Sequence, residues 1–389
     1  MIRTNLNWRI AAAAVAAGLT LAACGTTSDS SNDASGDSGG SGGGGGGGCS
    51  PATLAFLGPT TGPYANLGIN IIDGAKVALE EFKKDHPDCK VDLKTFDSQG
   101  DPKQATPLAL QMVKDDSIIG VIGPTFSGES DATGDAFNEA GLVTVSASAT
   151  NPALTTHGWT TFHRILGNDN VQGPPAADYI KTGLNAKKVM VVDDASEYGK
   201  GLADIVKQKL GSLVTSSDTV QQGQTDFSAT VTKAKSSGTD VLFYGGYYPE
   251  AGLFVKQLRA GGYTGTFVSG DGTKDPGFLQ AAGAKAAEGA ILTCPCVASD
   301  KSFTQKYTSL NNQDPGTYSP EAYDVANIFL QGIVEGNTDR QSMLDWVNSY
   351  DADGITKHLA FDKTGEIRKP VIWVYKVANG KIEPIKQIL

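Results

Sequence analysis

From Thr53 onward the chain alternates between short apolar runs and longer amphipathic stretches. The apolar runs have the length of buried strands, whereas the stretches between them carry apolar residues every three or four positions, as helices do. In the first stretch, Ile71, Ala75, Ala78 and Phe82 fall on one helical face. The alternation predicts an α/β fold with parallel sheets.

The strands are expected at the apolar runs, which are Thr53–Gly58, Val91–Asp97, Ile118–Gly123, Val143–Ser146, Val189–Asp193, Val241–Gly245, Thr266–Gly270 and Ala290–Thr293. Asp101 before Pro102 predicts the capped start of a helix. Residues 302–310, 321–335 and 339–349 are expected to be helical. A terminal pair of strands is expected at Leu359–Phe361 and Val371–Val377.

The N-terminal segment has a different pattern. Arg3 and Arg9 precede an apolar run, Ile10–Ala23, which is shorter than the roughly 20 residues that span a bilayer, and the run leads into Leu21-Ala22-Ala23-Cys24. This pattern indicates a secretory signal peptide, residues 1–23, whose cleavage leaves Cys24 first. It resembles the signal of bacterial lipoproteins, which implies acylation of Cys24 and a membrane anchor. The alternative is an ordinary signal peptide with a coincidental cysteine.

Composition separates a tether from a folded part. Residues 24–49 are almost entirely Gly, Ser, Thr, Asp and Asn, which cannot bury a core and predict a lipidated flexible tether. Residues 50–389 exceed the size of one typical core, so we expect two lobes. The net charge of -10 argues against nucleic acid as a partner and against a basic membrane-binding face.

The cysteines beyond Cys24 predict disulfide pairing, because an exported chain meets an oxidising environment. Cys49 and Cys89 each lie just before one of the first two expected strands. Neighbouring parallel strands would bring these two positions together, so we predict a disulfide between them. Cys294 and Cys296 remain, and they would close a small, strained ring. Two free thiols are an equally acceptable state for this second pair.

Ligands of open parallel sheets bind beyond the carboxyl ends of the strands. The loops at these positions combine small hydroxyl groups, exposed backbone, aromatic rings and a carboxylate; they are Pro124–Gly128, Ser146–Pro152, Tyr244–Glu250 and Gly270–Gly272. Ser127 could cap a helix and offer its hydroxyl and N–H to an anion. Glu250 is expected to be an acid favoured by a helix dipole, and Asp193-Asp194 a solvated turn.

Several short motifs in order make the chain similar to a known family. They are Gly62-Pro63, Asp101-Pro102-Lys103-Gln104-Ala105, Val121-Ile122-Gly123, Tyr198-Gly199-Lys200-Gly201-Leu202-Ala203, Asp226-Phe227-Ser228 and Tyr244-Gly245-Gly246-Tyr247. From about Thr53 to Lys381 the chain resembles the bacterial leucine/isoleucine/valine-binding proteins, the receptors of branched-chain amino acid ABC transporters. The resemblance implies the type I periplasmic binding protein fold, with two doubly wound parallel-sheet lobes joined by a three-stranded hinge. We expect residues 50–168 and 297–362 to form lobe 1, and 169–296 and 363–389 lobe 2.

The resemblance also implies a site for a zwitterion. Ser127, through its hydroxyl and N–H, and the N–H of Thr150 would bind the α-carboxylate. The carbonyl of Ser148, the hydroxyl of Thr150 and the carboxylate of Asp271 would bind the α-ammonium. Each charged hydrogen bond of this kind contributes about 1.5 to 3 kcal/mol. Alternatively, Ser127 is only a helix cap and Asp271 only satisfies a turn.

Aromatic residues complete the implied site. Tyr198 and Tyr247 of lobe 2 would close over the ligand, or could be ordinary aromatics of the cleft surface, and Tyr318 would lie near the side-chain pocket. The family acid is commonly glutamate, so the shorter Asp271 is expected to make a longer or water-bridged contact. Leu67 stands where an aromatic is frequent. Gly100 and Phe126 replace the family's disulfide, and Phe126 would narrow the side-chain pocket.

The sequence shows none of the usual signatures of an enzyme. It has no Gly-x-x-x-x-Gly-Lys-Ser/Thr loop, no Gly-x-Ser-x-Gly elbow and no His-Glu-x-x-His motif, and its histidines, His86, His157, His163 and His358, lack metal-ligand spacing. We therefore expect no cofactor, no metal and no catalysis.

The expected function is that of an extracytoplasmic, lipid-anchored, monomeric receptor. It would bind an aliphatic amino acid between its lobes and deliver it to the permease and ATPase subunits of an ABC transporter. The alternative is a receptor of the same fold that senses another amino acid, an amide or another small solute.

Overall fold

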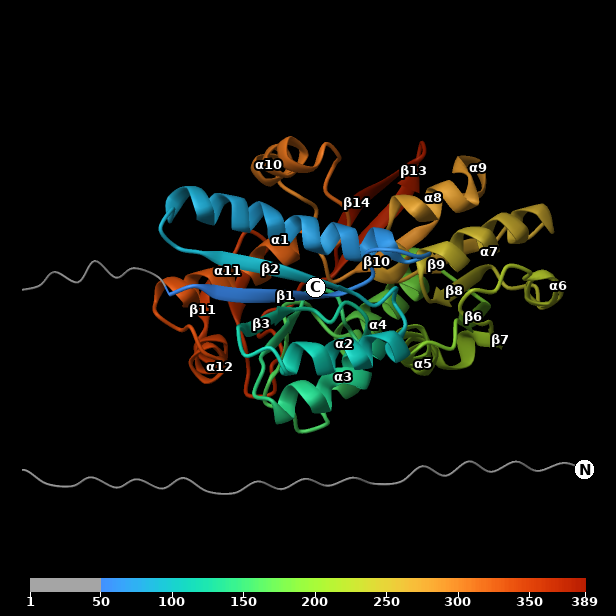
Figure 1. The fold of residues 1–389 in the computed structure, drawn as a ribbon. Helices are drawn as coiled ribbons and strands as arrows, with labels where there is room; N and C mark the ends of the chain where they lie inside the picture. The colour runs from blue at the N-terminus through green and yellow to red at the C-terminus, as the bar shows by residue number, and fades with distance from the viewer. Residues whose placement is uncertain (1–49) are drawn as a thin grey trace, which may run out of the picture. The chain divides into compact units, whose positions relative to one another are not determined.

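The computed structural model describes residues 50–389 (Figure 1). The predicted signal peptide, the acylated Cys24, the tether and Cys49 lie outside the described residues. The described chain is an α/β fold with two large, mainly parallel sheets, which confirms the expected fold class.

The first sheet forms the centre of lobe 1 and has the order β2-β1-β3-β4-β5, with all strands parallel. Its strands are β1 (Ala52–Gly58), β2 (Val91–Asp97), β3 (Ile118–Ile122), β4 (Thr144–Ser146) and β5 (Phe162–Arg164). Every residue of β1 and β3 is buried, which explains their continuous apolar sequences. The strand order reverses at β1, so the crevice between β1 and β3 is where a ligand is expected.

Helices cover both faces of this sheet. They are α1 (Ala65–Asp85), α2 (Pro102–Val113), α3 (Ser127–Glu139), α10 (Lys301–Asn311), α11 (Ser319–Val334) and α12 (Arg340–Ser349). α1 packs against α11, and α2 packs against α3 on the opposite face. Asp101 caps α2 as predicted, because its carboxylate accepts from the Lys103 N–H at 2.9 Å.

The second sheet forms lobe 2 and has the order β14-β13-β10-β9-β8-β6-β7. Its strands are β6 (Val189–Asp193), β7 (Val214–Thr219), β8 (Val241–Gly245), β9 (Thr266–Ser269), β10 (Ile291–Cys294), β13 (Trp373–Ala378) and β14 (Lys381–Gln387). The helices of this part are α4 (Asp169–Asp178), α5 (Glu197–Leu210), α6 (Ser228–Ser236), α7 (Tyr248–Ala260), α8 (Pro276–Ala282) and α9 (Ala284–Ala287). In this sheet the strand order reverses at β6, which lies between β7 and β8.

The two terminal strands expected from the sequence do not pair with each other. β12 (His358–Ala360) pairs with β11 (Asp351–Asp353), whereas β13 lies between β10 and β14 in the second sheet. The sequence did not predict β7 or β14, because neither has a buried apolar face: β7 is only partly buried and β14 is largely exposed. The short strand β5 was also missed.

The chain passes between the lobes three times, after β5, after β10 and between β12 and β13. Cys294 at the end of β10 forms a disulfide with Cys296, one of the two states that the sequence left open. Cys89 is also disulfide-bonded, and its predicted partner, Cys49, is not among the described residues.

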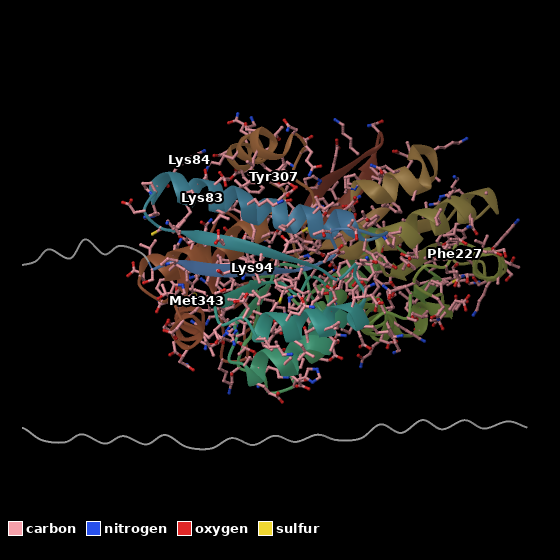
Figure 2. The ribbon with its side chains drawn as sticks, in the orientation of Figure 1. Lys83, Lys84, Lys94, Phe227, Tyr307 and Met343 are labelled. Carbon is pink, nitrogen blue, oxygen red and sulfur yellow. A yellow bond between two sulfur atoms is a disulfide. The ribbon has the colours of Figure 1, made fainter. Side chains whose placement is uncertain are left out.

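The surface carries charged side chains while large apolar ones point inward. Lys83 and Lys84 lie in the last turn of α1, where cations are favoured by the helix dipole, and Lys94 projects from β2 (Figure 2). Phe227 and Met343, labelled in the same view, are fully buried. Among residues 50–389, none of the helices is both long and apolar enough to cross a membrane.

One buried cation fixes the loop that leads to the ligand region. The side chain of Arg164, at the end of β5, is fully buried, and its Nε and Nη2 donate to the two carboxylate oxygens of Glu366 at 3.0 and 2.7 Å. Its Nη1 donates to the carbonyls of Ala149 and Asn151, each at 2.9 Å. Arg164 therefore determines the path of the chain around Thr150.

Replacing Arg164 should destabilise the protein strongly. We expect Arg164→Leu to lower the free energy of unfolding by roughly 3 to 5 kcal/mol, because it removes the cation that pairs with Glu366 and that donates to the carbonyls of Ala149 and Asn151. Urea unfolding followed by circular dichroism measures this change. Arg368→Leu is the matched control, since Arg368 is exposed and 3.9 Å from Asp351, and should change stability by about 0 to 1 kcal/mol. Equal effects of the two substitutions would contradict the assigned role of Arg164.

Candidate functional site

A cavity lies between the two lobes, beyond the carboxyl ends of their central strands. It is lined by Leu67, Thr125, Phe126, Ser127, Ser148 and Tyr318 from lobe 1 and by Tyr198, Tyr247 and Asp271 from lobe 2. All predicted ligand contacts except Thr150 therefore line one cavity. Its volume open to the centre of a water molecule is about 10 Å³, which is roughly enough for one water.

The lobe 1 wall presents backbone donors. Ser127 is the first residue of α3 and Phe126 is the N-cap, so the expectation that Ser127 caps the helix is wrong. The Ser127 hydroxyl instead accepts from the Asn151 N–H at 3.1 Å. Within the described part of the chain, the N–H groups of Ser127 and Thr150 donate no hydrogen bond. A helix start with free N–H groups favours an anion.

The same wall presents acceptors a few residues further on. The Ser148 hydroxyl donates to the Thr125 carbonyl at 2.5 Å, and the Ser148 carbonyl accepts no hydrogen bond from the described residues. The Thr150 hydroxyl is buried without a partner. Thr150 does not line the cavity, but its carbonyl accepts from the Asp169 N–H at 2.9 Å, which fixes it to the start of α4.

Asp271 is held by neutral donors. Its Oδ1 accepts from Gln172 Nε2 at 2.8 Å and from the Tyr198 hydroxyl at 2.9 Å, and its Oδ2 accepts from the Tyr318 hydroxyl. Burial raises the pKa of Asp271, and these hydrogen bonds oppose that shift. A cation that approached Asp271 would therefore interact mainly with the remaining lone pair of Oδ2.

Sequence analysis missed Asp169, the first residue of α4. Asp169 is fully buried, and neither of its carboxylate oxygens has a hydrogen-bond partner. Burial, followed by the charge of Asp271, raises its pKa well above the ordinary value, while the Thr150 side chain acts in the opposite direction. Its position just after the first crossing between the lobes was the only sequence signal. A cationic group of a ligand would supply the partner that such a buried carboxylate lacks.

The cavity is filled by aromatic rings from both lobes. The ring of Tyr247 lies 4.5 Å from that of Phe126, 5.4 Å from that of Tyr64 and 5.1 Å from that of Tyr198, measured between centroids. The sequence analysis did not single out Tyr64, because the family resemblance placed Leu67 where an aromatic is frequent. Leu67 lies on α1 and lines the cavity. Burial raises the pKa of Tyr198, Tyr247 and Tyr318 well above the usual range, so all three are neutral donors.

Phe126 and Gly100 are adjacent in space, at the positions where the resembled family carries a disulfide. A Cβ atom on Gly100 would lie 2.9 Å from the Phe126 ring, so the bulk of Phe126 depends on glycine at position 100. Tyr318 has a left-handed backbone, with φ of 70°, which costs roughly 1 to 2 kcal/mol for a residue with a side chain. Such strain is common where a side chain is held for function.

Comparison with known proteins identifies the family. The family model described as periplasmic binding protein matches residues 51–381. The chain belongs to the periplasmic binding protein family. Proteins of this family are solute receptors rather than enzymes, as the sequence predicted.

Relatives and solved structures agree with this assignment. A Leu/Ile/Val-binding protein of Rhizobium johnstonii is 32% identical over 341 residues, which cover 85% of this chain and 92% of the relative. The substrate-binding protein LivJ of Streptococcus pneumoniae, solved with isoleucine, has a TM-score of 0.81 and 26% identity and covers 87% of this chain and 100% of its own. The leucine-binding protein LivK of Thermotoga maritima has a TM-score of 0.78 and 26% identity, with 86% and 98% covered.

Of two further acids in this binding protein, Asp194 and Glu250, only the first differs from its expectation. Asp194 was predicted to lie in a solvated turn, but it is only 1% exposed, and burial raises its pKa to about 7. The prediction was wrong because the start of α5 and the loop after β8 pack against the turn: a Cβ atom on Gly199 would lie 2.2 Å from Asp194 Oδ1, and one on Gly246 would lie 2.8 Å from Asp194 Oδ2. Glu250 lies in the first turn of α7 as predicted, and it also accepts from the Tyr64 hydroxyl of lobe 1 at 2.8 Å.

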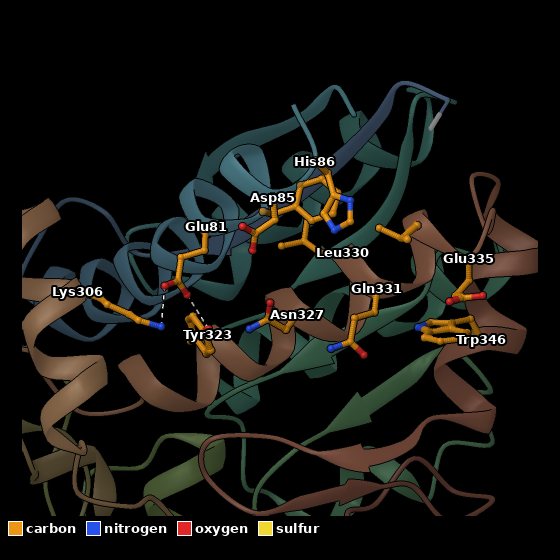
Figure 3. Close-up of a pocket in the computed structure, with 12 residues that line it drawn as sticks. Glu81, Asp85, His86, Lys306, Tyr323, Asn327, Leu330, Gln331, Glu335 and Trp346 are labelled. Carbon is orange, nitrogen blue, oxygen red and sulfur yellow. Dashed lines mark hydrogen bonds and ion pairs between the residues drawn. The ribbon is translucent and has the colours of Figure 1, made fainter. Parts of the chain in front are cut away.

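A larger surface pocket lies away from the cleft, among α1, α10, α11 and α12 of lobe 1 (Figure 3). Its cavity volume is about 580 Å³. The Glu81 carboxylate in its wall is already paired with Lys306 at 2.6 Å and with the Tyr323 hydroxyl at 2.7 Å. This pocket contacts only one lobe, so closure of the lobes cannot enclose a ligand there. In the described part of the chain no group of His, Cys, Asp and Glu could hold a metal ion.

The raised pKa of Asp169 predicts an unusual effect of pH on stability. The unfolded chain ionises this group near pH 4, whereas the raised pKa keeps it protonated to higher pH in the folded protein, so its contribution to stability falls as pH rises through that window. Asp169→Asn should therefore stabilise the ligand-free protein at pH 7 by about 1 to 3 kcal/mol, and the gain should vanish below about pH 4. Urea unfolding at a series of pH values measures it.

Asp115→Asn is the control of opposite sign. Lys94 and Ser117 hold the pKa of Asp115 at about 2, so its charge favours the folded protein at neutral pH. That variant should lose stability at pH 7 and recover it in acid. A loss of stability at pH 7 in Asp169→Asn would show that the Asp169 carboxylate is compensated in the folded protein.

Proposed function

We propose that this protein is an extracytoplasmic receptor that binds a branched-chain α-amino acid between its lobes and delivers it to an ABC permease. One observation carries this proposal: the cleft places free backbone donors at one end and buried acceptors without partners a few residues away. A zwitterion is the small solute that satisfies both sets. Two relatives support the same class of ligand, because they are known as binding proteins for leucine, isoleucine and valine, one of them for threonine and alanine as well.

The α-carboxylate is bound in this proposal by the N–H of Ser127 at the start of α3 and by the N–H of Thr150. The α-ammonium is bound by the Ser148 carbonyl, the Thr150 hydroxyl and the Asp271 carboxylate, with Asp169 supplying further negative charge. The charged pairs fix the orientation of the ligand, so its side chain points toward Leu67 and the aromatic rings, of which Phe126 sets the available width.

Binding in this proposal requires opening and closing of the two lobes, residues 50–168 with 297–362 and residues 169–296 with 363–389. The cavity is too small for an amino acid, because Tyr247 packs on Phe126 across the cleft. An open form would admit the ligand, and Tyr198, Tyr247 and Asp271 would then reach it only on closure. Contacts from both lobes that exist only in the closed form shift the population toward it.

The N-terminal segment completes the proposal. Cleavage after residue 23 and acylation of Cys24 would anchor the receptor at the outer face of the cell membrane. The tether of residues 24–49 has a typical reach of roughly 25 to 30 Å, which keeps the monomeric receptor near the permease and ATPase subunits of its transporter.

Titration calorimetry should detect branched-chain amino acids directly. Residues 50–389 are unfolded and refolded to remove carried-over ligand, then titrated with the twenty amino acids and with small amides. We expect micromolar or tighter binding of leucine, isoleucine or valine. If none of these three gives a heat of binding, and a polar amino acid, an amide or another solute does, the branched-chain specificity is wrong. The protein would then be a receptor for that solute.

Removing the lobe 2 acid should weaken this binding. We expect Asp271→Ala to reduce the affinity for the bound amino acid by about 2 to 5 kcal/mol, because a buried ammonium loses its charged partner. Calorimetry with the refolded variant measures the change, and an unfolding curve establishes that the variant is folded. Asp204→Ala, at an exposed position of α5, is the control. Unchanged affinity in Asp271→Ala would remove Asp271 from the site.

A further inference from the structure

The loop that follows β9 carries two acids with different partners. Asp271 at its start lines the cavity, whereas Asp275 at its end does not. Asp275 is only 1% exposed, and both of its carboxylate oxygens accept hydrogen bonds from lobe 1: Oδ1 from Asn66 Nδ2 at 2.9 Å and Oδ2 from Asn70 Nδ2 at 3.3 Å. Asn66 and Asn70 lie one turn apart on α1 and therefore face the same way.

The loop is rigid between these two acids. The Lys274 N–H donates to the Asp271 carbonyl at 2.9 Å, and the Asp275 N–H donates to the Thr273 carbonyl at 2.8 Å. The Thr273 hydroxyl is bound to the Gly246 carbonyl at 3.1 Å, which fixes the loop to the end of β8. Asp275 also accepts from the Gly277 N–H at 2.7 Å and so caps α8. Asp271 and Asp275 must consequently move together with lobe 2.

The partners on lobe 1 are equally fixed. A Cβ atom on Gly316 would lie 2.2 Å from Asn70 Nδ2, so the Asn70 amide is seated directly on the backbone of the 316–318 turn. From this turn the Thr317 hydroxyl donates to the Lys274 carbonyl and accepts from Lys274 Nζ at 3.3 Å, and Tyr318 donates to Asp271. One lobe 2 loop thus meets one lobe 1 surface at three successive points.

We propose that Asp275 is a positioning residue that couples ligand retention to lobe closure, through hydrogen bonds to Asn66 and Asn70 that exist only when the lobes are closed. We call this set of contacts, Asp275 with Asn66 and Asn70, the interlobe latch. Asp275 cannot touch a ligand in the cavity. It acts by holding the rigid loop, and with it Asp271, over the cleft. This role rests on the proposed function of the cleft.

The latch predicts a specific change in binding kinetics. Asn66→Ala removes one latch bond and leaves the α8 cap intact. With L-leucine as the probe, stopped-flow measurements should show release about tenfold faster than in the parent. Association should not become slower, because the ligand enters the open form and the variant populates that form more. Asp275→Asn keeps the oxygen that caps α8 but loses the second carboxylate oxygen as an acceptor. The double variant with Asn66→Ala should release leucine more slowly than the two single effects predict when added as free energies.

Controls separate the latch from general damage and from the function proposed above. Lys76→Ala, an exposed position on the same helix, should leave release unchanged, and unfolding curves should show Asn66→Ala as stable as Lys76→Ala. Small-angle X-ray scattering without leucine should give a larger radius of gyration for Asn66→Ala than for the parent. If the parent does not bind leucine, the branched-chain function fails and scattering alone decides the latch. Release rates and scattering equal to those of Lys76→Ala would overturn the latch.

Discussion

The region between the two lobes contains a buried carboxyl group, Asp169, whose pKa is raised well above its ordinary value by burial and by the neighbouring Asp271. This carboxyl group makes no hydrogen bond or ion pair with the described residues, and it lies close to Asp271, a second buried carboxylate. Ionising a buried carboxyl group without a partner costs several kcal/mol, which is why its pKa rises. In the proposed function, a ligand ammonium in the cleft would favour the ionised form of Asp169. The same feature would then lower the stability of the ligand-free protein at neutral pH and add affinity for a cationic group.

Buried acceptors can bind a ligand in one orientation only if the groups around them are fixed. Arg164 fixes the carbonyls on both sides of Thr150, and the Asp169 N–H binds the Thr150 carbonyl in turn. Asp271 is oriented by three donors before any ligand arrives. These bonds prevent the acceptors from turning toward one another or toward water, so little ordering is left to occur on binding.

Buried strands and loop positions could be predicted from the sequence, and side-chain partners could not. The apolar runs of β1, β3 and β8 and the capped start of α2 have unambiguous patterns, and the loops after them do meet in one cavity. β14 was missed because its residues are mostly exposed and show no periodic burial. Asp169 and Tyr64 were missed because each precedes or begins a helix, where an acid or an aromatic is commonplace. Their roles arise from contacts between segments far apart in the sequence, which spacing does not report.

Selectivity and retention have different physical origins in this molecule. The latch at Asp275 holds the lobes together whether or not the cleft contains a solute, so it cannot distinguish one solute from another. In the proposed function, groups that gain a partner from the ligand, such as Asp169 and the Ser127 N–H, make closure depend on the chemistry of the ligand. A ligand must in addition replace the contact between Tyr247 and Phe126, which penalises side chains that fill the space less well than the rings do. Apparent affinity is then the balance of these terms, and a stronger latch lengthens the bound state without changing which solute is preferred.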